Sequence, residues 1–459
     1  MGHYSQCCKL HLAPKFAKCT TRQFQAKDDM TPTAPDRYGV ESPYAWWRLM
    51  ASLALMTIGG AGMYGAAVVL PAVQGEFAVA RSDASFPYTA TLIGFGLGGI
   101  LMGRVTDRFG VMAALLLGTA GLGLGFVTAG STGSLWAFSL AHGLLIGFLG
   151  TSATMAPVVA DTSQWFNKRR GIALGICLSG NYLAGSVWPP VMQYFIDSVG
   201  WRQTYLGLGV FCVLSMVPLS LVLRRPPPSG AAMTAAAPVT LRSARFVGQS
   251  DPRQPLGLSP NLLLLLLSVA GVSCCVAMAM PQVHIVAYCT DLGFGAARGA
   301  EMLSVMMGFG IASRLLSGWI SDHIGGLHTL LLGSVLQGLA LLMFLPFDGL
   351  VPLYLVSAMF GLFQGGIVPS YALIVREYFS PEQAGARVGT VLMSSLLGMA
   401  LGGWLSGAVF DWTGSYHAAF INGVAWNLLN LAIVVFLIRR ARARPAGIAA
   451  APPSSAGVT

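Results

Sequence analysis

Apolar residues along this chain of 459 residues gather into runs separated by short polar stretches. Each run is about 20 residues long, which is the length that a helix needs to cross the ~30 Å hydrocarbon layer of a bilayer. The pattern therefore predicts an all-α polytopic membrane protein with twelve transmembrane helices. The predicted spans are 50–72, 86–103, 111–130, 135–159, 171–195, 203–223, 261–284, 300–319, 327–346, 351–375, 388–409 and 418–438.

Composition supports the same interpretation. Hydrophobic residues make up 54% of the chain and charged residues only 10%, against roughly a quarter charged in an average soluble domain. The net charge of +10 comes from residues in the loops, with no aromatic residues interleaved and no nucleic-acid motif, so we expect no nucleic-acid partner. The eight cysteines have no CxxC spacing and no accompanying histidine cluster, which favours free thiols over a metal site.

The basic residues also predict the orientation. Short loops rich in lysine and arginine stay in the cytoplasm. Such loops alternate with loops that carry little more than Arg81, Arg202 and Arg298. Both termini are therefore expected in the cytoplasm, with the protein in the plasma membrane, which in a bacterium is the inner membrane. The basic residues of the predicted cytoplasmic loops and tail include Arg104, Arg108, Lys168, Arg169, Arg170, Arg224, Arg225, Arg242, Arg245, Arg253, Arg439, Arg440, Arg442 and Arg444.

The longest connection between runs contains Pro226, Pro227 and Pro228 and lacks the apolar content of a core, so it predicts a flexible linker between two halves. Residues 1–45 lack an apolar segment of signal-peptide type. The first 29 residues, which precede Met30, are interpreted as a mis-assigned start or a disordered tail. The expected organisation is a cytoplasmic tail over 1–45, six-helix bundles over 46–223 and 261–438, a cytoplasmic linker over 224–260 and a basic tail over 439–459.

The two halves share landmarks at a nearly constant offset. The stretch Gly103 to Gly110 matches Gly318 to Gly325 at an offset of 215, with an aspartate at the same place in both. At an offset of 214 the matching pairs are Gly147 and Gly361, Gly171 and Gly385, Gly175 and Gly389, Asp197 and Asp411, and Gly200 and Gly414. The landmarks predict two six-helix pseudo-repeats.

These residues resemble the major facilitator superfamily, whose loop after the second helix reads Gly-x-x-x-Asp-Arg-x-Gly, as at Gly103 to Gly110. The stretches 164–171, 200–202 and 313–322 are similar to the monocarboxylate and oxalate/formate carrier branch. The resemblance covers about 390 residues and implies the major facilitator fold, with transport as the activity.

The Gly-x-x-x-Asp-Arg loop is expected to act as a conformational latch. Gly103 and Gly110 allow close packing or a tight turn. Asp107 can accept hydrogen bonds from the free amide groups that begin the third helix, and Arg108 can pair with a carboxylate or with helix-end carbonyls when the cytoplasmic side is closed. Asp322 is the matching aspartate of the second half. The alternative is that these charges only fix the topology.

Arg314 is the one formally charged residue well inside an apolar run. It precedes Asp322 by eight residues, or about 12 Å of helix. A guanidinium at that depth costs at least ~2.5 kcal/mol on insertion scales, so it should pair or face a watery cavity, and its planar fork suits a carboxylate. The resemblance implies that an arginine at this place binds the anionic substrate. The alternative is that Arg314 reaches to the cytoplasmic interface and stabilises the helix end.

Two histidines and a set of polar residues complete the candidate site. His284 follows Pro281, which is expected to break the seventh helix at a place where transporters tend to gate. His284 could carry a coupled proton, and His142 is a second candidate. Simple hydrogen bonding is the alternative for both. Residues that could line the substrate path, or else serve packing, are Tyr64, Asn181, Tyr182, Gln364 and Tyr371.

Three departures from the resembled branch leave the coupling open. Gly310 stands where the monocarboxylate carriers have an acid, residues 59–62 are glycine and alanine where those carriers have another, and 388–409 hold no second base of the oxalate type. The leading prediction is a secondary, alternating-access transporter of a small organic anion, with a monocarboxylate favoured and symport or exchange unresolved. The alternatives are efflux of neutral or lipophilic compounds and a transporter-like sensor. We expect no enzymatic activity, cofactor or metal, a functional monomer, and the lipid bilayer as surroundings.

Overall fold

The computed structural model describes residues 39–226, 255–379 and 381–443, so most of the two predicted tails and most of the linker lie outside the described residues. The described chain is helical and contains no strand. Twelve helical segments are long and apolar enough to cross a membrane. Each of the twelve predicted spans coincides with one of them, which confirms the predicted fold class, although most of the helices extend several residues beyond the apolar run.

The first half contains six of these segments. Two of them are interrupted, because α1 and α2 form one span and α5, η1 and α6 form another. The helices are α1 Pro43–Gly59, α2 Ala61–Phe77, α3 Arg81–Phe109, α4 Val111–Ser131, α5 Leu135–Leu140, η1 Ala141–Thr151, α6 Ser152–Trp165, α7 Arg170–Val199 and α8 Trp201–Val222.

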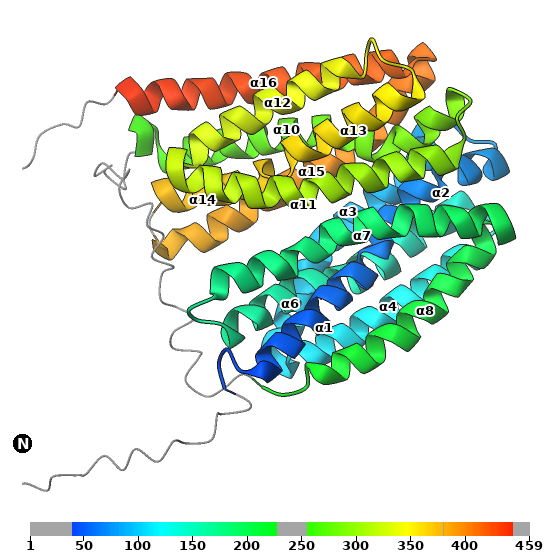
Figure 1. Ribbon diagram of the computed structural model, residues 1–459, viewed down its shortest axis with the longest axis horizontal. Coiled ribbons are helices and arrows are strands. Elements are labelled where there is room, and N and C mark those ends of the chain that lie inside the picture. The colour runs from blue at the N-terminus through cyan, green and yellow to red at the C-terminus, as the bar shows by residue number, and fades with distance from the viewer. Residues whose placement is uncertain (1–38, 227–254, 380, 444–459) are drawn as a thin grey trace, which may run out of the picture. The chain divides into compact units, whose positions relative to one another are not determined.

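The second half repeats this order after a short 3-10 helix, η3 (Pro255–Gly257), with α13 and α14 forming one interrupted span. Figure 1 shows α4 beside α8 and α12 beside α16, pairs that also contact each other. The helices are α10 Pro260–Asp291, α11 Ala296–Ile324, α12 Gly326–Met343, α13 Leu350–Gln364, α14 Ile367–Tyr378, α15 Pro381–Thr413 and α16 Tyr416–Ala443. The expected break at Pro281 is wrong, because α10 continues through this residue.

Both halves begin with the same helix start. Ser42 accepts a hydrogen bond from the Ala45 amide and Ser259 accepts one from the Leu262 amide, each at 3.3 Å, and a proline follows each serine. A serine N-cap followed by proline satisfies orphan amide groups and presets the helical φ angle. The dipeptide Ser-Pro thus fixes where each six-helix half starts.

The glycine landmarks also have the same structural role in both halves. Gly110 and Gly325 turn the chain with φ of +83° and +79°, and Gly200 and Gly414 do so with +85° and +66°, a region that favours glycine. A Cβ at Gly147 would lie 2.4 Å from the Thr91 carbonyl oxygen, and one at Gly361 would lie 1.9 Å from that of Met306.

The end of the helices at which α8 ends and α10 begins is called the linker end, and the opposite end is called the far end. At the linker end, Arg48 and Asp161 form a buried ion pair, with Nε to Oδ2 at 2.8 Å and Nη2 to Oδ1 at 2.7 Å. Arg48 also donates to the Leu223 carbonyl at 3.0 Å, and the Tyr44 hydroxyl donates to that of Val222. The start of α1 is thereby bound to the end of α6 and the end of α8.

Exposed tryptophans lie near both ends of the helices. Trp47 and Trp319 are exposed near the linker end, and Trp136 and Trp412 near the far end. Tryptophan is enriched at the two membrane–water interfaces, where its ring meets the lipid headgroups. The exposed tryptophans therefore agree with a multi-pass membrane protein.

Candidate substrate site

Arg314 contacts an aromatic ring of the opposite half. Its guanidinium carbon lies 4.8 Å from the centre of the Tyr182 ring, with Arg314 on α11 and Tyr182 on α7. The Arg314 Nε is buried without a hydrogen-bond partner, and no carboxylate of the described residues forms an ion pair with this side chain. A stack on an aromatic face leaves the in-plane donors of a guanidinium free for another group.

Glycines allow this contact between the halves. Gly310 lies one turn before Arg314, and a Cβ there would lie 2.4 Å from the Tyr182 ring. Gly185 lies one turn after Tyr182, and a Cβ there would meet the Tyr64 ring at 2.6 Å and Met307 at 2.5 Å. The Tyr182 ring thus fills the space in which a side chain at position 310 would begin.

Tyr64 belongs to the same junction. Its buried hydroxyl lies 3.5 Å from the Met307 sulfur on α11. Three predicted site residues, Arg314, Tyr182 and Tyr64, therefore come together where α2, α7 and α11 meet. Asn181 is half-buried next to Tyr182 in the chain.

Gln364 lies at the end of α13, where the tenth span is interrupted. Its Oε1 accepts from the Gln282 Nε2 at 2.9 Å, while its own buried Nε2 has no partner. Gly365, the next residue, is packed against the Gly310 carbonyl and Ser313 of α11. Gln364 thus lies on a segment that contacts α11, the helix of Arg314. Its side-chain Nε2 is a hydrogen-bond donor without a partner.

Tyr371 and His142 lie inside single bundles. The Tyr371 hydroxyl donates to the Asn430 Oδ1 at 3.0 Å within the second half. His142 lies in the first half, with Nδ1 at 3.1 Å from the Thr91 hydroxyl and Nε2 at 3.2 Å from the Tyr205 hydroxyl. Both side chains are fully buried, so neither joins the group around Arg314.

No ion pair of the described residues joins the predicted latch residues of the two halves in this conformation. Asp107, Arg108 and Asp322 are exposed at the linker end, and a Cβ at Gly103 or Gly110 would meet open space. Asp107 was expected to accept hydrogen bonds from the start of the third helix, but the structure gives it none. In the second half that position is filled from α14, because Glu377 accepts from the Gly326 amide at 3.0 Å.

The far end holds the halves together through a residue that the sequence prediction had not included. Arg81, at the start of α3, places Nη1 3.1 Å from Asp291 Oδ2 and Nη2 3.2 Å from Asp291 Oδ1. Nη1 also donates to the Tyr416 hydroxyl, and the guanidinium lies 4.6 Å from the centre of the Phe410 ring. This group, Arg81 with Asp291, Phe410 and Tyr416, is called the far-end latch.

Asp411 adds a second contact between the halves at the far end. Its two carboxylate oxygens accept from the backbone amides of Arg81 and Ser82, each at 2.8 Å. It thus caps α3 from the opposite half. Two signals in the sequence pointed to this end: Arg81 is one of few basic residues in its set of loops, and Asp411 is a repeat landmark.

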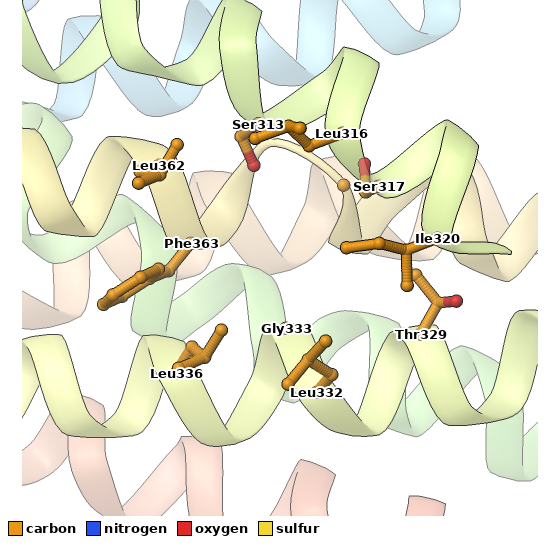
Figure 2. A pocket seen from close by; sticks show the side chains of 11 residues that line it. Ser313, Leu316, Ser317, Ile320, Thr329, Leu332, Gly333, Leu336, Leu362 and Phe363 are labelled. Atoms are coloured by element: carbon orange, nitrogen blue, oxygen red, sulfur yellow. The ribbon is translucent and has the colours of Figure 1, made fainter. Parts of the chain in front are cut away.

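A cavity of about 170 Å³ lies on another face of α11, between α11, α12 and α13. Figure 2 shows Ser313, Leu316 and Ile320 facing it from one helix and Leu332 and Leu336 from another. The Ser317 and Thr329 hydroxyls donate to carbonyls of their own helices. No charged side chain lines this cavity, so it suits an apolar occupant rather than an anion.

The chain belongs to the Major Facilitator Superfamily, whose family model matches residues 50–354 and 302–458. It is 28% identical over 335 residues to monocarboxylate transporter 13 of Bos taurus, covering 72% of this chain and 75% of that protein. It is 22% identical over 308 residues to the agnestins efflux protein AgnL12 of Paecilomyces divaricatus, covering 66% and 67%.

Solved structures share the fold. A bacterial homolog of the human lysosomal transporter Spinster, in an inward-facing and occupied conformation, has a TM-score of 0.62 at 16% identity and covers 87% of this chain and 96% of its own. The protein is therefore a major facilitator transporter, an integral multi-pass membrane protein related to the monocarboxylate transporters. Its relatives are transporters, which supports a non-enzymatic role.

Proposed function

We propose that this protein is a secondary transporter that carries a small organic anion, with a monocarboxylate as the favoured substrate, by alternating access. The observation that carries the proposal is the Arg314 side chain at the contact between the halves, which has no ion pair within the described chain and no hydrogen bond at Nε. A half-buried cation without a counterion in a membrane protein needs an anion or water. A carboxylate satisfies it through two parallel hydrogen bonds.

The proposed site is shared between the halves. Arg314 supplies the charge from the second half, while Tyr182 and Tyr64 supply aromatic walls from the first, and Asn181 and Gln364 are proposed to add polar contacts. An anion bound there touches both halves at once, so its binding can bias how they move relative to each other. The single cation favours one carboxylate over two.

The contacts of the glycines support alternating access. At the far end, a Cβ at Gly403 or Gly407 would approach the first half to 3.0 and 2.9 Å. At the linker end, six glycines face open space, because a Cβ added to any of them would have no atom within 4 Å. They are Gly103, Gly171, Gly175, Gly318, Gly385 and Gly389. We propose that these repeat-matched glycines meet when the linker end closes, together with Asp107, Arg108 and Asp322.

We propose that the linker end faces the cytoplasm. The three far-end arginines are each paired with an acid: Arg81 with Asp291, Arg202 with Glu76 and Arg298 with Glu301. Arg104, Arg108 and Arg169 at the linker end have no ion pair within the described chain. The uncompensated positive charge at the linker end follows the bias of cytoplasmic loops.

Uptake into proteoliposomes tests the proposed substrate class. The purified protein is assayed with a radiolabelled short-chain monocarboxylate, and unlabelled competitors are added as matched pairs of a carboxylate and its primary amide. The proposal predicts inhibition by the carboxylates and none by the amides. Equal competition by the two would contradict an anion site. Repeating the assay with and without a pH gradient distinguishes symport from exchange.

A second candidate function is efflux of neutral or lipophilic compounds. The apolar cavity beside α11 (Figure 2) favours it, because a volume of about 170 Å³ without charged lining suits a small apolar molecule. This function would be supported if the protein transports a lipophilic dye, if carboxylates do not inhibit that transport, and if the protein takes up no organic anion.

A further inference from the structure

His284 is bonded to the far-end latch through Tyr416. The His284 side chain is fully buried on α10, with Nε2 at 2.8 Å from the Gly403 carbonyl oxygen and Nδ1 at 3.3 Å from the Tyr416 hydroxyl. The same hydroxyl accepts from Arg81. A single oxygen atom therefore joins the histidine of one half to the arginine of the other.

The partners fix which ring nitrogen carries hydrogen. A carbonyl oxygen can only accept, so Nε2 must carry the hydrogen that is donated to Gly403. In the neutral ring Nδ1 is then an acceptor, and the Tyr416 hydroxyl donates to it. Donation runs in one direction from Arg81 to Tyr416, from Tyr416 to His284, and from His284 to Gly403. The Tyr416 hydroxyl and both ring nitrogens of His284 are thereby satisfied.

A second proton on His284 conflicts with this arrangement. Nδ1 becomes a donor, so the Tyr416 oxygen faces donors from both His284 and Arg81, and its own hydrogen loses its acceptor. The imidazolium also brings a second positive charge close to Arg81 in a buried place, where unpaired charge is costly.

The charged and titratable groups around the ring are already engaged. Asp291 accepts from Arg81 through both oxygens, and Asp411 accepts from two backbone amides. The Tyr288 hydroxyl donates to Asp348 at 2.7 Å, and the His417 Nε2 lies 3.7 Å from that same carboxylate. The negative charge of Asp411 favours an imidazolium, and the positive charge of Arg81 opposes it. No hydrogen bond joins Asp291 or Asp411 to the His284 ring.

We propose that His284 is a proton-binding site that controls the far-end latch: the latch closes around the neutral histidine, and a proton at Nδ1 favours the conformation in which Arg81 has left Asp291 and Tyr416. By linkage, a proton that binds the open state more tightly shifts the population toward that state. Acid at the far end, the outer face in the proposed orientation, then holds this end open.

The inference rests on the alternating access of the proposed function, but its test needs no substrate. Spin labels are attached to cysteines introduced as Gly133→Cys and Gly349→Cys, two exposed far-end positions in opposite halves, in protein whose native cysteines are replaced by serine. Distances between the labels are measured by pulsed electron resonance from about pH 8 to about pH 5, the range that spans histidine titration. A failure of anion transport would leave this readout unaffected.

Acid is expected to increase the longer-distance population, by up to about tenfold for each pKa unit that separates the two states. His284→Gln can keep both hydrogen bonds without titrating, so it should stay closed at all pH values. Tyr416→Phe, which removes the link, should respond less than the unsubstituted protein. Two control variants should respond to pH like the unsubstituted protein. They are His417→Gln, which changes a second histidine at the far end, and His142→Gln, which changes a buried histidine of the first half.

A distance distribution that does not change with pH in the unsubstituted protein overturns the proposal. So does a response in His284→Gln as large as that of the unsubstituted protein, or its loss in His417→Gln. Monodisperse elution and an unchanged far-end distance at about pH 8 exclude misfolding of His284→Gln, and Tyr416→Phe provides an independent variant.

Discussion

The guanidinium carbon of Arg314 lies 4.8 Å from the centre of the Tyr182 ring, and the two residues belong to opposite halves of the protein. Because an aromatic partner occupies the face of the guanidinium and leaves its edge free, Tyr182 can orient the cation without neutralising it. An acid at position 310, as in the resembled carriers, would have to displace this ring.

Substitution of Tyr182 tests that orienting role. Tyr182→Phe keeps the ring and should transport normally, whereas Tyr182→Leu should raise the KM for the anion by about 2- to 30-fold, the effect of losing a cation–π contact of about 0.5–2 kcal/mol. Initial uptake rates at varied substrate concentration measure this effect. Tyr194→Leu, a change at an exposed position of the same helix, is the control and should leave KM unchanged. An equal increase in KM in Tyr182→Phe and Tyr182→Leu would contradict an orienting role of the aromatic ring.

The close approach at Gly310 gives a second prediction. Gly310→Ala places a methyl group 2.4 Å from the Tyr182 ring, and overpacking of this kind typically costs about 1–3 kcal/mol. The maximal transport rate should fall about tenfold or more, with the protein still folded. Gly318→Ala on the same helix meets open space in this conformation, so its thermal stability should not change. A fully active Gly310→Ala protein would contradict the tight contact.

The buried pair of Arg48 and Asp161 predicts a large effect on stability. Arg48→Ala leaves the Asp161 carboxylate buried without its partner, which should destabilise the protein by about 3–5 kcal/mol. Thermal unfolding in detergent, followed by tryptophan fluorescence, measures the loss. The double variant Arg48→Met with Asp161→Leu should recover most of it, since the stranded charge is then gone. Arg298→Ala, which breaks the exposed pair with Glu301, should have little effect.

The repeat provides a matched control for Asp411. Asp411 caps α3 across the halves, whereas its counterpart Asp197 accepts from Gln193 of its own helix. Loss of an N-cap costs about 0.5–2 kcal/mol, so Asp411→Ala should open the far end about 2- to 30-fold more often. A cysteine introduced as Ser85→Cys, buried near that end, should then react faster with maleimide. Asp197→Ala should not change the labelling rate; identical rates in both variants would exclude a role for the cap.

The sequence was sufficient for the twelve helices and the pairing of the halves, because these depend on local properties. A run of about 20 apolar residues spans a bilayer wherever it lies, and a glycine with positive φ makes the same turn in both halves, as at Gly200 and Gly414. The proximity of Arg314, Tyr182 and Tyr64 was only partly predictable. Each residue could be placed within a span, but the face of each helix depends on packing across the halves.

The far-end latch was harder to foresee because its parts are far apart in the chain. Arg81, Asp291 and Tyr416 come from three helices, and each looks like an ordinary loop-end residue in the sequence. The missing hydrogen bond at Asp107 and the apolar cavity beside α11 likewise depend on how helices pack and on the conformation adopted. The interruption of the tenth span at Gly365 and Gly366 was marked only by two adjacent glycines in an apolar run.

The role of Arg314 in anion binding is the central claim, and transport by Arg314 variants in proteoliposomes tests it most directly. Arg314→Ala should abolish carboxylate uptake, and Arg314→Lys, which keeps the charge but lacks the planar fork, should retain a small fraction with a KM raised at least about tenfold. Both variants must elute and unfold like the unsubstituted protein. Undiminished carboxylate uptake by correctly inserted Arg314→Ala protein would contradict the account.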